Sequence, residues 1–352
     1  MTANNIESSS YIFQDIFENN WNETVNTFDD MNLHENLLRG IYGYGFEKPS
    51  MLEKLAIKPC IAGRDMFAQA YSGSGKTSSY VISVLQRIDP EIKDCQALIL
   101  APTRELAQSI NYVISSVGQY MNITCHACTG GTHIHSDIER FEKGVQIVTG
   151  TPGRVTDVIN RSKLRIDHVK MLVLEEADEI LDHGFEEQIS GIVDKLPSST
   201  QIVVFSASLP AELDKITAKV MKDPVKILLK SNNLTLEPIR QFYVNVEREH
   251  QHLSQQERDV IVQQFQTGSS QVLITVDLFA RSINHQVNLY INYDLPNSMD
   301  NYIHRIGHSG AYGRKATAIT LITKEDQGML RSIEKYYDTH IEELPADIAN
   351  LI

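Results

Sequence analysis

A glycine-rich string between residues 70 and 77 carries the sharpest chemical signal in the sequence. It reads Ala-Tyr-Ser-Gly-Ser-Gly-Lys-Thr and directly follows the short apolar run Asp65–Ala70. Glycines let backbone N–H groups approach phosphate oxygens at the start of a helix, Lys76 can neutralise phosphate charge, and the Thr77 hydroxyl can ligate Mg²⁺. We therefore predict a phosphate-binding loop that comprises Ser72, Gly73, Ser74, Gly75, Lys76 and Thr77. The alternative is a helix-capping turn that contains a lysine by chance.

Two consecutive carboxylates offer the acidic partner that a phosphate loop requires. Glu175 and Glu176 directly follow the apolar run 169–174. At a strand end, one carboxylate can hold the shell of a magnesium ion while the next polarises a water for attack on the terminal phosphate. Alone, the segment would be read as an acidic helix cap. Together with the loop it predicts a nucleoside triphosphatase, with Thr77 and Glu175 at the metal and Lys76 and Glu176 at the reacting phosphate.

Short apolar runs that alternate with amphipathic stretches must position these groups. Between about Trp21 and Lys230 the further runs are Ala97–Ala101, Val145–Thr149, Met171–Leu174 and Ile202–Ser206. Apolar runs of this length, without polar alternation, are typical of parallel strands that are buried on both faces. Helical stretches lie between them, so the sequence predicts a doubly wound α/β domain.

A polar, turn-rich stretch at 231–238 predicts a linker to a second, shorter domain. Beyond it the apolar runs resume at Gln241–Val246, Gln271–Val276, Val287–Tyr293 and Ala316–Ile322. We expect an acidic, unstructured tail over residues 1–20, a first domain over 21–230 and a second over 239–352. The fold class is therefore α/β with two tandem domains.

Charge and composition exclude several classes of protein. The net charge is -13, from 45 acidic and 32 basic residues, which excludes a generally basic nucleic-acid coat but not a locally basic channel. No apolar run approaches the ~18 residues that span a bilayer. Four cysteines fit a reducing compartment, and the N-terminus lacks the pattern of a secretory signal. We expect a cytoplasmic protein with no membrane segment.

Further strings stand in an order that resembles the DEAD-box RNA helicases. They are Gly45–Ser50, Ala101–Ala107 (APTRELA), Gly130–Gly131, Thr151–Arg154 (TPGR), Ser206–Ser208 (SAS) and Tyr302–Gly307 (YIHRIG). The resemblance covers nearly all of the chain after residue 20 and is strongest to the translation-initiation members of the family. It implies RecA-like domains that close on ATP, Mg²⁺ and single-stranded RNA. It further implies a monomer, with translation-initiation scaffold proteins as candidate partners.

The resemblance also assigns roles to individual residues. At the nucleotide it places Phe46, Lys48 and Glu53 beside the phosphate loop, with Phe46 packed on adenine. Along the RNA backbone it places Pro102, Thr103, Arg104, Gly130, Gly131, Thr151, Gly153, Arg154 and Arg281. Hydroxyls, arginines and exposed glycine N–H groups suit phosphates and carry no base information. Ser206, Ser208, His304 and Arg305 would couple the two domains.

The departures from the family pattern gather at the chemistry. Glu53 replaces the glutamine that reads adenine, and an ionised glutamate can only accept hydrogen bonds, so adenine specificity should weaken. Glu175 is one methylene longer than the aspartate of the family. His308 and Ala311 replace two arginine fingers, which are typically worth ~10³–10⁵ in turnover. Ser208 replaces a threonine but keeps its hydroxyl.

The second domain is predicted to be incomplete. Residues 246–249 run within a few positions into residues 254–258, where the family has further strand–helix units between the two strings. A parallel sheet without its middle strands must re-pair its neighbours or leave backbone groups unsatisfied. In addition, Val276 replaces a phosphate-contacting threonine, and the string 280–284 around Arg281 is altered.

Two hypotheses for function remain open after these departures. The chain is either an active ATP-dependent RNA helicase or a degenerate copy that binds nucleotide, RNA or a scaffold protein and hardly turns over. An unrelated kinase would need an acceptor site that the sequence does not contain. The pair Cys125 and Cys128 has metal-ligand spacing but no second pair, so we predict a buried strand in which the thiols act as small apolar residues.

Overall fold

The computed structural model describes residues 17–21, 23–70, 73–229, 239–245, 289–296, 301–302, 305–306, 316–337 and 339–344. The chain divides into two compact units, with the boundary between Asn233 and Leu234. The predicted linker 231–238 lies outside the described residues, as do residues 1–16 of the predicted tail. Within the described ranges, no helix is long and apolar enough to cross a bilayer.

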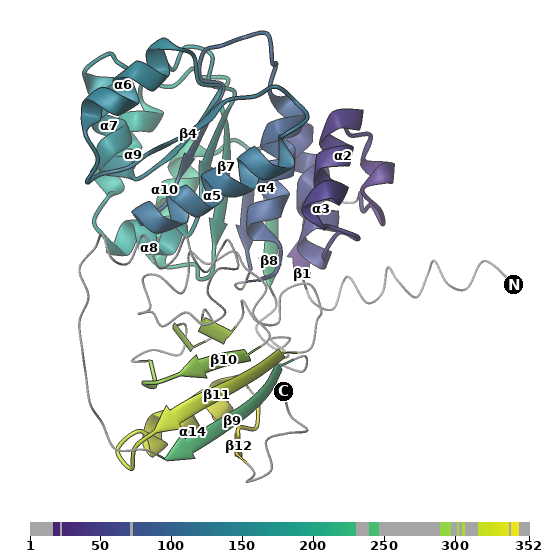
Figure 1. Ribbon diagram of the computed structural model, residues 1–352, viewed down its shortest axis with the longest axis vertical. Coiled ribbons are helices and arrows are strands. Elements are labelled where there is room, and N and C mark those ends of the chain that lie inside the picture. The colour runs from purple at the N-terminus through teal and green to yellow at the C-terminus, as the bar shows by residue number, and fades with distance from the viewer. Residues whose placement is uncertain are drawn as a thin grey trace, which may run out of the picture. The chain divides into compact units, whose positions relative to one another are not determined.

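An eight-stranded sheet forms the centre of the first unit (Figure 1). Its order is β1-β8-β2-β7-β6-β3-β5-β4, and all neighbours are parallel except the pair β1 and β8. The strands are β1 (Phe17–Asn19), β2 (Met66–Gln69), β3 (Ala97–Leu100), β4 (Cys125–Cys128), β5 (Ile147–Gly150), β6 (Met171–Leu174), β7 (Gln201–Ser206) and β8 (Val225–Leu229). The α/β class with a parallel sheet is therefore confirmed.

Helices connect the parallel strands and cover both faces of the sheet. They are α2 (Glu35–Tyr44), α3 (Met51–Ile61), α4 (Lys76–Arg87), α5 (Arg104–Val117), α6 (Ile134–Glu142), α7 (Pro152–Asn160), α8 (Ala177–Asp182), α9 (Glu186–Val193) and α10 (Ala211–Val220), with a 3₁₀ turn η1 at Asp29–Met31. Two of these helices begin at residues that favour a helix start. The Thr103 hydroxyl caps α5 by accepting from the Leu106 N–H at 3.3 Å, and α7 has proline at its first position.

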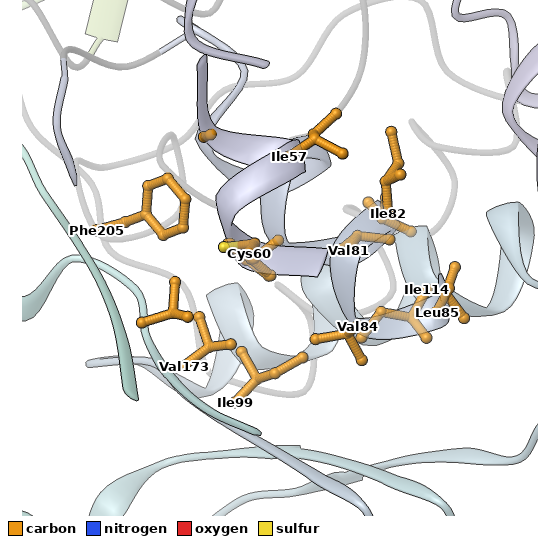
Figure 2. Packing of buried hydrophobic residues seen from close by; sticks show 14 of the residues in the cluster. Ile57, Cys60, Val81, Ile82, Val84, Leu85, Ile99, Ile114, Val173 and Phe205 are labelled. Carbon is orange, nitrogen blue, oxygen red and sulfur yellow. The ribbon is translucent and has the colours of Figure 1, made fainter. Parts of the chain in front are cut away.

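Side chains alternate between two apolar clusters along the central strands. In β6, Met171 and Val173 pack in the cluster under α2–α5, whereas Leu172 and Leu174 pack in the cluster under α7–α10. Figure 2 shows the first cluster, where the side chains of α3 and α4 meet those of strands β3, β6 and β7. Because both faces are buried, the central strands are mostly apolar, and the predicted runs overlap β2, β3, β5, β6 and β7, whereas β8 was not predicted by such a run.

The predicted tail is wrong in its last residues. Phe17–Asn19 form strand β1, which pairs antiparallel with β8 from Leu229 to Ile227. The next residue fixes this pairing, because the Asn20 side chain donates to the Pro224 carbonyl at 3.2 Å and accepts from the Lys226 N–H at 2.8 Å. Backbone pairing needs no apolar pattern, so the composition of the tail gave no sign of a strand that covers the sheet edge.

The second unit contains a smaller, all-parallel sheet with the order β10-β11-β9-β12. Its elements are β9 (Ile239–Asn245), β10 (Leu289–Asn292), β11 (Ala316–Ile322), α14 (Gln327–Tyr336) and β12 (Glu342–Glu343). β11 pairs with all seven residues of β9 and with all four of β10. In the described part of this sheet the strands thus pair with one another. Such re-pairing is one of the two outcomes predicted for a sheet without its middle strands; the other was unsatisfied backbone groups. The predicted strand 271–276 lies outside the described residues.

Candidate nucleotide and nucleic-acid site

Most of the predicted site residues of the first unit directly follow the carboxyl ends of parallel strands. The phosphate loop follows β2, Pro102–Arg104 follow β3, Gly130–Gly131 follow β4, Thr151 follows β5, Glu175–Glu176 follow β6 and Ser208 follows β7. Parallel strands bring these ends to one edge of the sheet, which is where open α/β sheets bind ligands. Tyr71 and Ser72 of the loop lie outside the described residues.

The phosphate loop presents a buried cation at the start of α4. Gly73 and Gly75 have φ of 79° and 98°, and Gly75 caps the helix that begins at Lys76. Lys76 is only 6% exposed, and its Nζ has no hydrogen-bond partner among the described residues; the same holds for Ser74 Oγ. A buried ammonium without such a partner is costly, and the N-terminus of a helix favours anions. These groups fit the phosphates of a nucleotide.

Residues at the start of α3 contact the phosphate loop. This contact was not predicted from the sequence. Ser50 Oγ donates to the Ser74 carbonyl at 2.8 Å and accepts from the Glu53 N–H at 3.2 Å, while the Glu53 carboxylate accepts from the Ser50 N–H. A Cβ on Gly75 would lie 2.5 Å from Ser50 Oγ. The spacing Ser-x-x-Glu is that of a capping box, so the pattern itself could have revealed this contact.

The Glu53 side chain is therefore buried against Ser50 at the start of α3, whereas the prediction placed it only beside adenine. The side chain is 1% exposed, and its Oε1 has no hydrogen-bond partner within the described part of the chain. Burial raises the pKa of this carboxyl, against the opposing effect of hydrogen bonds from Ser78 and Ser50. Phe46 is also buried, beside Tyr44 with ring centroids 4.9 Å apart, whereas Lys48 is exposed.

The two carboxylates after β6 lie within electrostatic range of the loop. Glu175 is 3% exposed, its N–H donates to the Leu100 carbonyl at 2.9 Å, and its Oε2 finds no partner in the described ranges. Burial raises its pKa from 4.5 to about 8; Lys76 opposes this shift, and Glu176 and Asp178 add to it. Glu176 caps α8 in the left-handed conformation, with φ of 51°. This donor set of carboxylate oxygens and the Thr77 hydroxyl fits Mg²⁺.

Asp178 links this acidic segment to the segment after β7. Its Oδ2 accepts from the Ser208 N–H at 2.9 Å and from the Ser208 hydroxyl at 2.8 Å, and its N–H donates to Ser206 Oγ at 3.2 Å. Serine at position 208 thus makes the hydroxyl contact that the family's threonine could make. The sequence reasoning left Asp178 out of the site, although it is the last acid of the same string.

The predicted RNA-facing strings also contact one another. A Cβ on Gly131 would lie 2.7 Å from Arg104 Nη1, so this guanidinium packs against the glycine backbone. Gly130, Gly131 and Gly153 are exposed, Thr103 and Thr151 are half-buried, and Pro102 is buried. Arg154 differs from this set, because its side chain is only 11% exposed and pairs with Asp137. The structure brings the strings together but turns Arg154 inward.

Fewer of the predicted residues of the second unit are described. Arg305 donates through Nη1 to the Asp294 carbonyl at 2.6 Å and lies 3.5 Å from Asn292 Oδ1. Arg281, His304, His308 and Ala311 lie outside the described residues. The roles predicted for them remain predictions.

The cysteine pair occupies strand β4, as predicted. Cys125 packs against the cluster on one face of the sheet and Cys128 lies in the cluster on the other face. Burial raises the pKa of both thiols. Because the two side chains lie on opposite faces, they cannot share one metal ion or form one disulfide without rearrangement.

Comparisons with known proteins identify the family of this chain. Residues 51–216 match the DEAD/DEAH box helicase family, and residues 198–313 match the helicase conserved C-terminal domain. The ATP-dependent RNA helicase eIF4A of Chaetomium globosum is 48% identical over 382 residues, which cover 95% of this chain and 96% of the relative. That alignment is longer than the 352 residues of this chain, so the relative has additional residues within the aligned region.

Solved structures show the same likeness. The S. cerevisiae protein Dbp5 bound to RNA and ADP BeF3 superposes with a TM-score of 0.79 at 30% identity, over 93% of this chain and 97% of Dbp5. A DEAD box protein from the hyperthermophile Methanococcus jannaschii superposes with a TM-score of 0.66 at 30% identity, over 92% and 100% of the two chains. The chain therefore belongs to the DEAD-box RNA helicases, with RecA-like units in tandem, and is similar to eIF4A along nearly its whole length.

Proposed function

We propose that the first unit binds Mg²⁺–ATP and single-stranded RNA, and that hydrolysis is impaired in this chain. The observation that carries the nucleotide site is the buried Lys76 at the start of α4, whose Nζ has no hydrogen-bond partner among the described residues and which lies within electrostatic range of Glu175. Membership of the family supports ATP as the nucleotide. The neighbour Dbp5, which was solved with RNA, supports RNA as the second ligand.

Each group at this site has a task in the proposed binding. Backbone N–H groups of residues 73–77 and the Lys76 ammonium would hold the phosphates, and Thr77 and Glu175 would hold the metal. Bound Mg²⁺ supplies charge neutralisation at the terminal phosphates. Glu176 would accept a proton from the attacking water at its carboxylate. Pro102, Thr103, Arg104, Gly130, Gly131, Thr151 and Gly153 offer a hydroxyl, guanidinium and N–H surface for RNA phosphates.

The proposed impairment rests on residues at which the chain departs from the family. Glu175 is one methylene longer than the aspartate of the family, and a displacement of ~1 Å in a carboxylate at the metal can cost about a hundredfold in rate. His308 and Ala311 replace arginine fingers, and the longer alignment with eIF4A supports a shortened chain. These observations favour a degenerate, nucleotide- and RNA-binding copy over a fully active helicase. We place it in the cytoplasm as a monomer that acts in translation initiation, with scaffold proteins of that process as candidate partners.

ATP hydrolysis by the full chain, with and without single-stranded RNA, separates the two hypotheses. We expect nucleotide binding that the substitution Lys76→Ala abolishes, together with little hydrolysis and little stimulation by RNA. RNA-stimulated turnover near that of an intact family member would refute the impairment. Failure of the wild-type chain to bind either ligand would refute the proposed function as a whole.

The chain with Glu175→Asp, His308→Arg and Ala311→Arg tests the contribution of the shortened second unit. We expect this chain to regain some hydrolysis but still to fail in duplex unwinding, because the missing strand–helix units are not restored. Recovered unwinding would show that the shortened second unit suffices.

A further inference from the structure

A buried carboxylate, Asp137 on α6, joins three elements beside the predicted RNA surface. It is only 2% exposed. Its Oδ1 lies 2.8 Å from His126 Nε2 on β4, and its Oδ2 accepts from Arg154 Nη1 on α7 at 3.3 Å and from the Cys128 thiol at 3.7 Å. Burial raises the pKa of Cys128, so this thiol keeps the proton that it donates. The carboxylate is thus enclosed by donors.

Arg154 extends this cluster to the loop between β4 and α6. Its Nη2 donates to the Thr132 carbonyl and lies 3.5 Å from Thr132 Oγ1, while Nη1 is bound to Asp137. A largely buried guanidinium with these partners has few donors left for an RNA phosphate. To reach one, it would have to leave Asp137 as a buried carboxylate without its arginine, which is strongly unfavourable.

The loop that Arg154 holds contains the exposed glycines of the predicted RNA surface. In the described part of the chain, Gly130 has no atom of another segment within 4 Å of where a Cβ would stand, and Gly131 has φ of 82° and packs on Arg104. Glycines have many accessible backbone conformations, so such a loop needs anchors to keep its N–H groups in one arrangement. The Thr132 carbonyl is the anchor next to them.

We propose that Asp137 is a positioning residue for RNA binding: through Arg154 it holds the Thr132 carbonyl, and thereby orients the N–H groups of Gly130 and Gly131 toward an RNA backbone. The inference deepens the proposed function and rests on its RNA-binding part. In this arrangement Arg154 acts through the loop and makes no direct phosphate contact. We call Asp137, His126, Arg154 and Thr132 the Asp137 brace.

Two variants test the brace in the full chain. Asp137→Asn keeps the shape but removes the charge that holds Arg154. Arg154→Lys keeps the charge of residue 154 but loses the fork that reaches Asp137 and Thr132 together. The matched control is Asp157→Asn, which removes the exposed ion pair with Arg161 on the same helix α7. Trp21 fluorescence and nucleotide affinity confirm that each variant is folded, and Arg154→Lys carries the test if Asp137→Asn does not fold.

The main readout is the affinity for a fluorescein-labelled oligouridylate, measured by anisotropy between ~50 and 200 mM salt. Both brace variants should bind about tenfold more weakly, because the binding-competent arrangement of the loop becomes less populated. The slope of log affinity against log salt should stay unchanged, whereas loss of a direct phosphate contact would reduce it by about 0.7. The control should bind like the wild type.

Hydrogen exchange supplies a readout that needs no RNA. The amides of residues 130–132 should exchange faster in both brace variants and at the wild-type rate in Asp157→Asn. Unchanged hydrogen exchange in the brace variants would overturn the inference. Full RNA affinity of Arg154→Lys would overturn it too. Tighter RNA binding by Asp137→Asn would also overturn it, because it would mean that Arg154 contacts phosphate directly. If the wild type binds no RNA, the proposed function fails and the inference about RNA fails with it, even where exchange shows that the brace orders the loop.

Discussion

Replacing Glu175 by glutamine should remove a pH dependence of stability from the first unit. Burial raises the pKa of this carboxyl from 4.5 to about 8. The folded chain therefore keeps a proton on Glu175 that the unfolded chain has already lost above about pH 5. Under these conditions rising pH favours the unfolded state, so stability from this group is complete at low pH and is lost as pH approaches 8.

The size of the effect follows from the two pKa values. Inside the window, one extra bound proton changes the free energy of unfolding by about 1.4 kcal/mol per pH unit. From about pH 6 to pH 9 the contribution of Glu175 to the free energy of unfolding should fall by about 3 kcal/mol, because the contribution levels off above the folded pKa. Glutamine has nearly the same shape and does not titrate. The difference in stability between variant and wild type should therefore grow by this amount in favour of the variant.

Urea titrations in EDTA, followed by tryptophan fluorescence, measure this difference. Trp21 is the single tryptophan of the sequence and packs against the first apolar cluster, so its emission reports on the first unit. Glu212→Gln, at an exposed position on α10, is the matched control and should follow the wild type at every pH. Parallel stability curves for wild type and Glu175→Gln would refute the reasoning, because they would mean that Glu175 is already ionised in the folded chain.

Three further sets of substitutions test the phosphate loop, its support from α3 and the amino ends of the central strands. Gly75→Ala should abolish binding of a fluorescent ATP analogue, because φ is 98° and the new Cβ would lie 2.5 Å from Ser50 Oγ; Gly191→Ala in open space on α9 should bind normally. Glu53→Gln should increase the preference for ATP over GTP in competition binding, since the amide has an N–H donor at every pH, whereas the Glu53 carboxyl has a donor only when it is protonated; an unchanged ratio would contradict this. Asp65→Ala should lower the free energy of unfolding in urea by about 2–4 kcal/mol, since its carboxylate accepts the Ile202 and Lys222 N–H groups at 2.8 and 2.6 Å; a loss under ~1 kcal/mol would contradict this.

The parts of the fold that could be predicted are those in which local pattern and tertiary environment agree. The run Met171–Leu174 is strand β6 with the same bounds, because a strand covered on both faces needs an apolar residue at each position. The turn into α4 was also predictable, since its string of glycines before Lys76 allows the positive φ that Gly73 and Gly75 adopt. Neither case requires knowledge of a distant residue.

The parts that escaped prediction depend on partners far apart in the sequence. β1 forms through backbone pairing with β8, more than 200 positions away, as the contact of Asn20 with Lys226 illustrates. Arg154 could be identified by its motif, but the direction of its side chain is set by Asp137 and Thr132, which the motif does not include. Residue type thus predicted which polar groups are available at the site. The contacts of Arg154 with Asp137 and Thr132 decide where its guanidinium lies.

If the proposed function is correct, binding and turnover should be separable in this chain. The contacts that shape the candidate site, between Ser50 and Ser74, Asp178 and Ser208, and Arg154 and Thr132, join residues of the first unit only. Substitutions at His308 and Ala311, and a shortened second sheet, leave these contacts intact. In the proposed function they remove arginines that the family resemblance assigns to stabilisation of the transition state, which is distinct from ground-state binding. A chain that holds nucleotide and RNA while hydrolysing slowly is therefore consistent with the way its polar contacts are distributed.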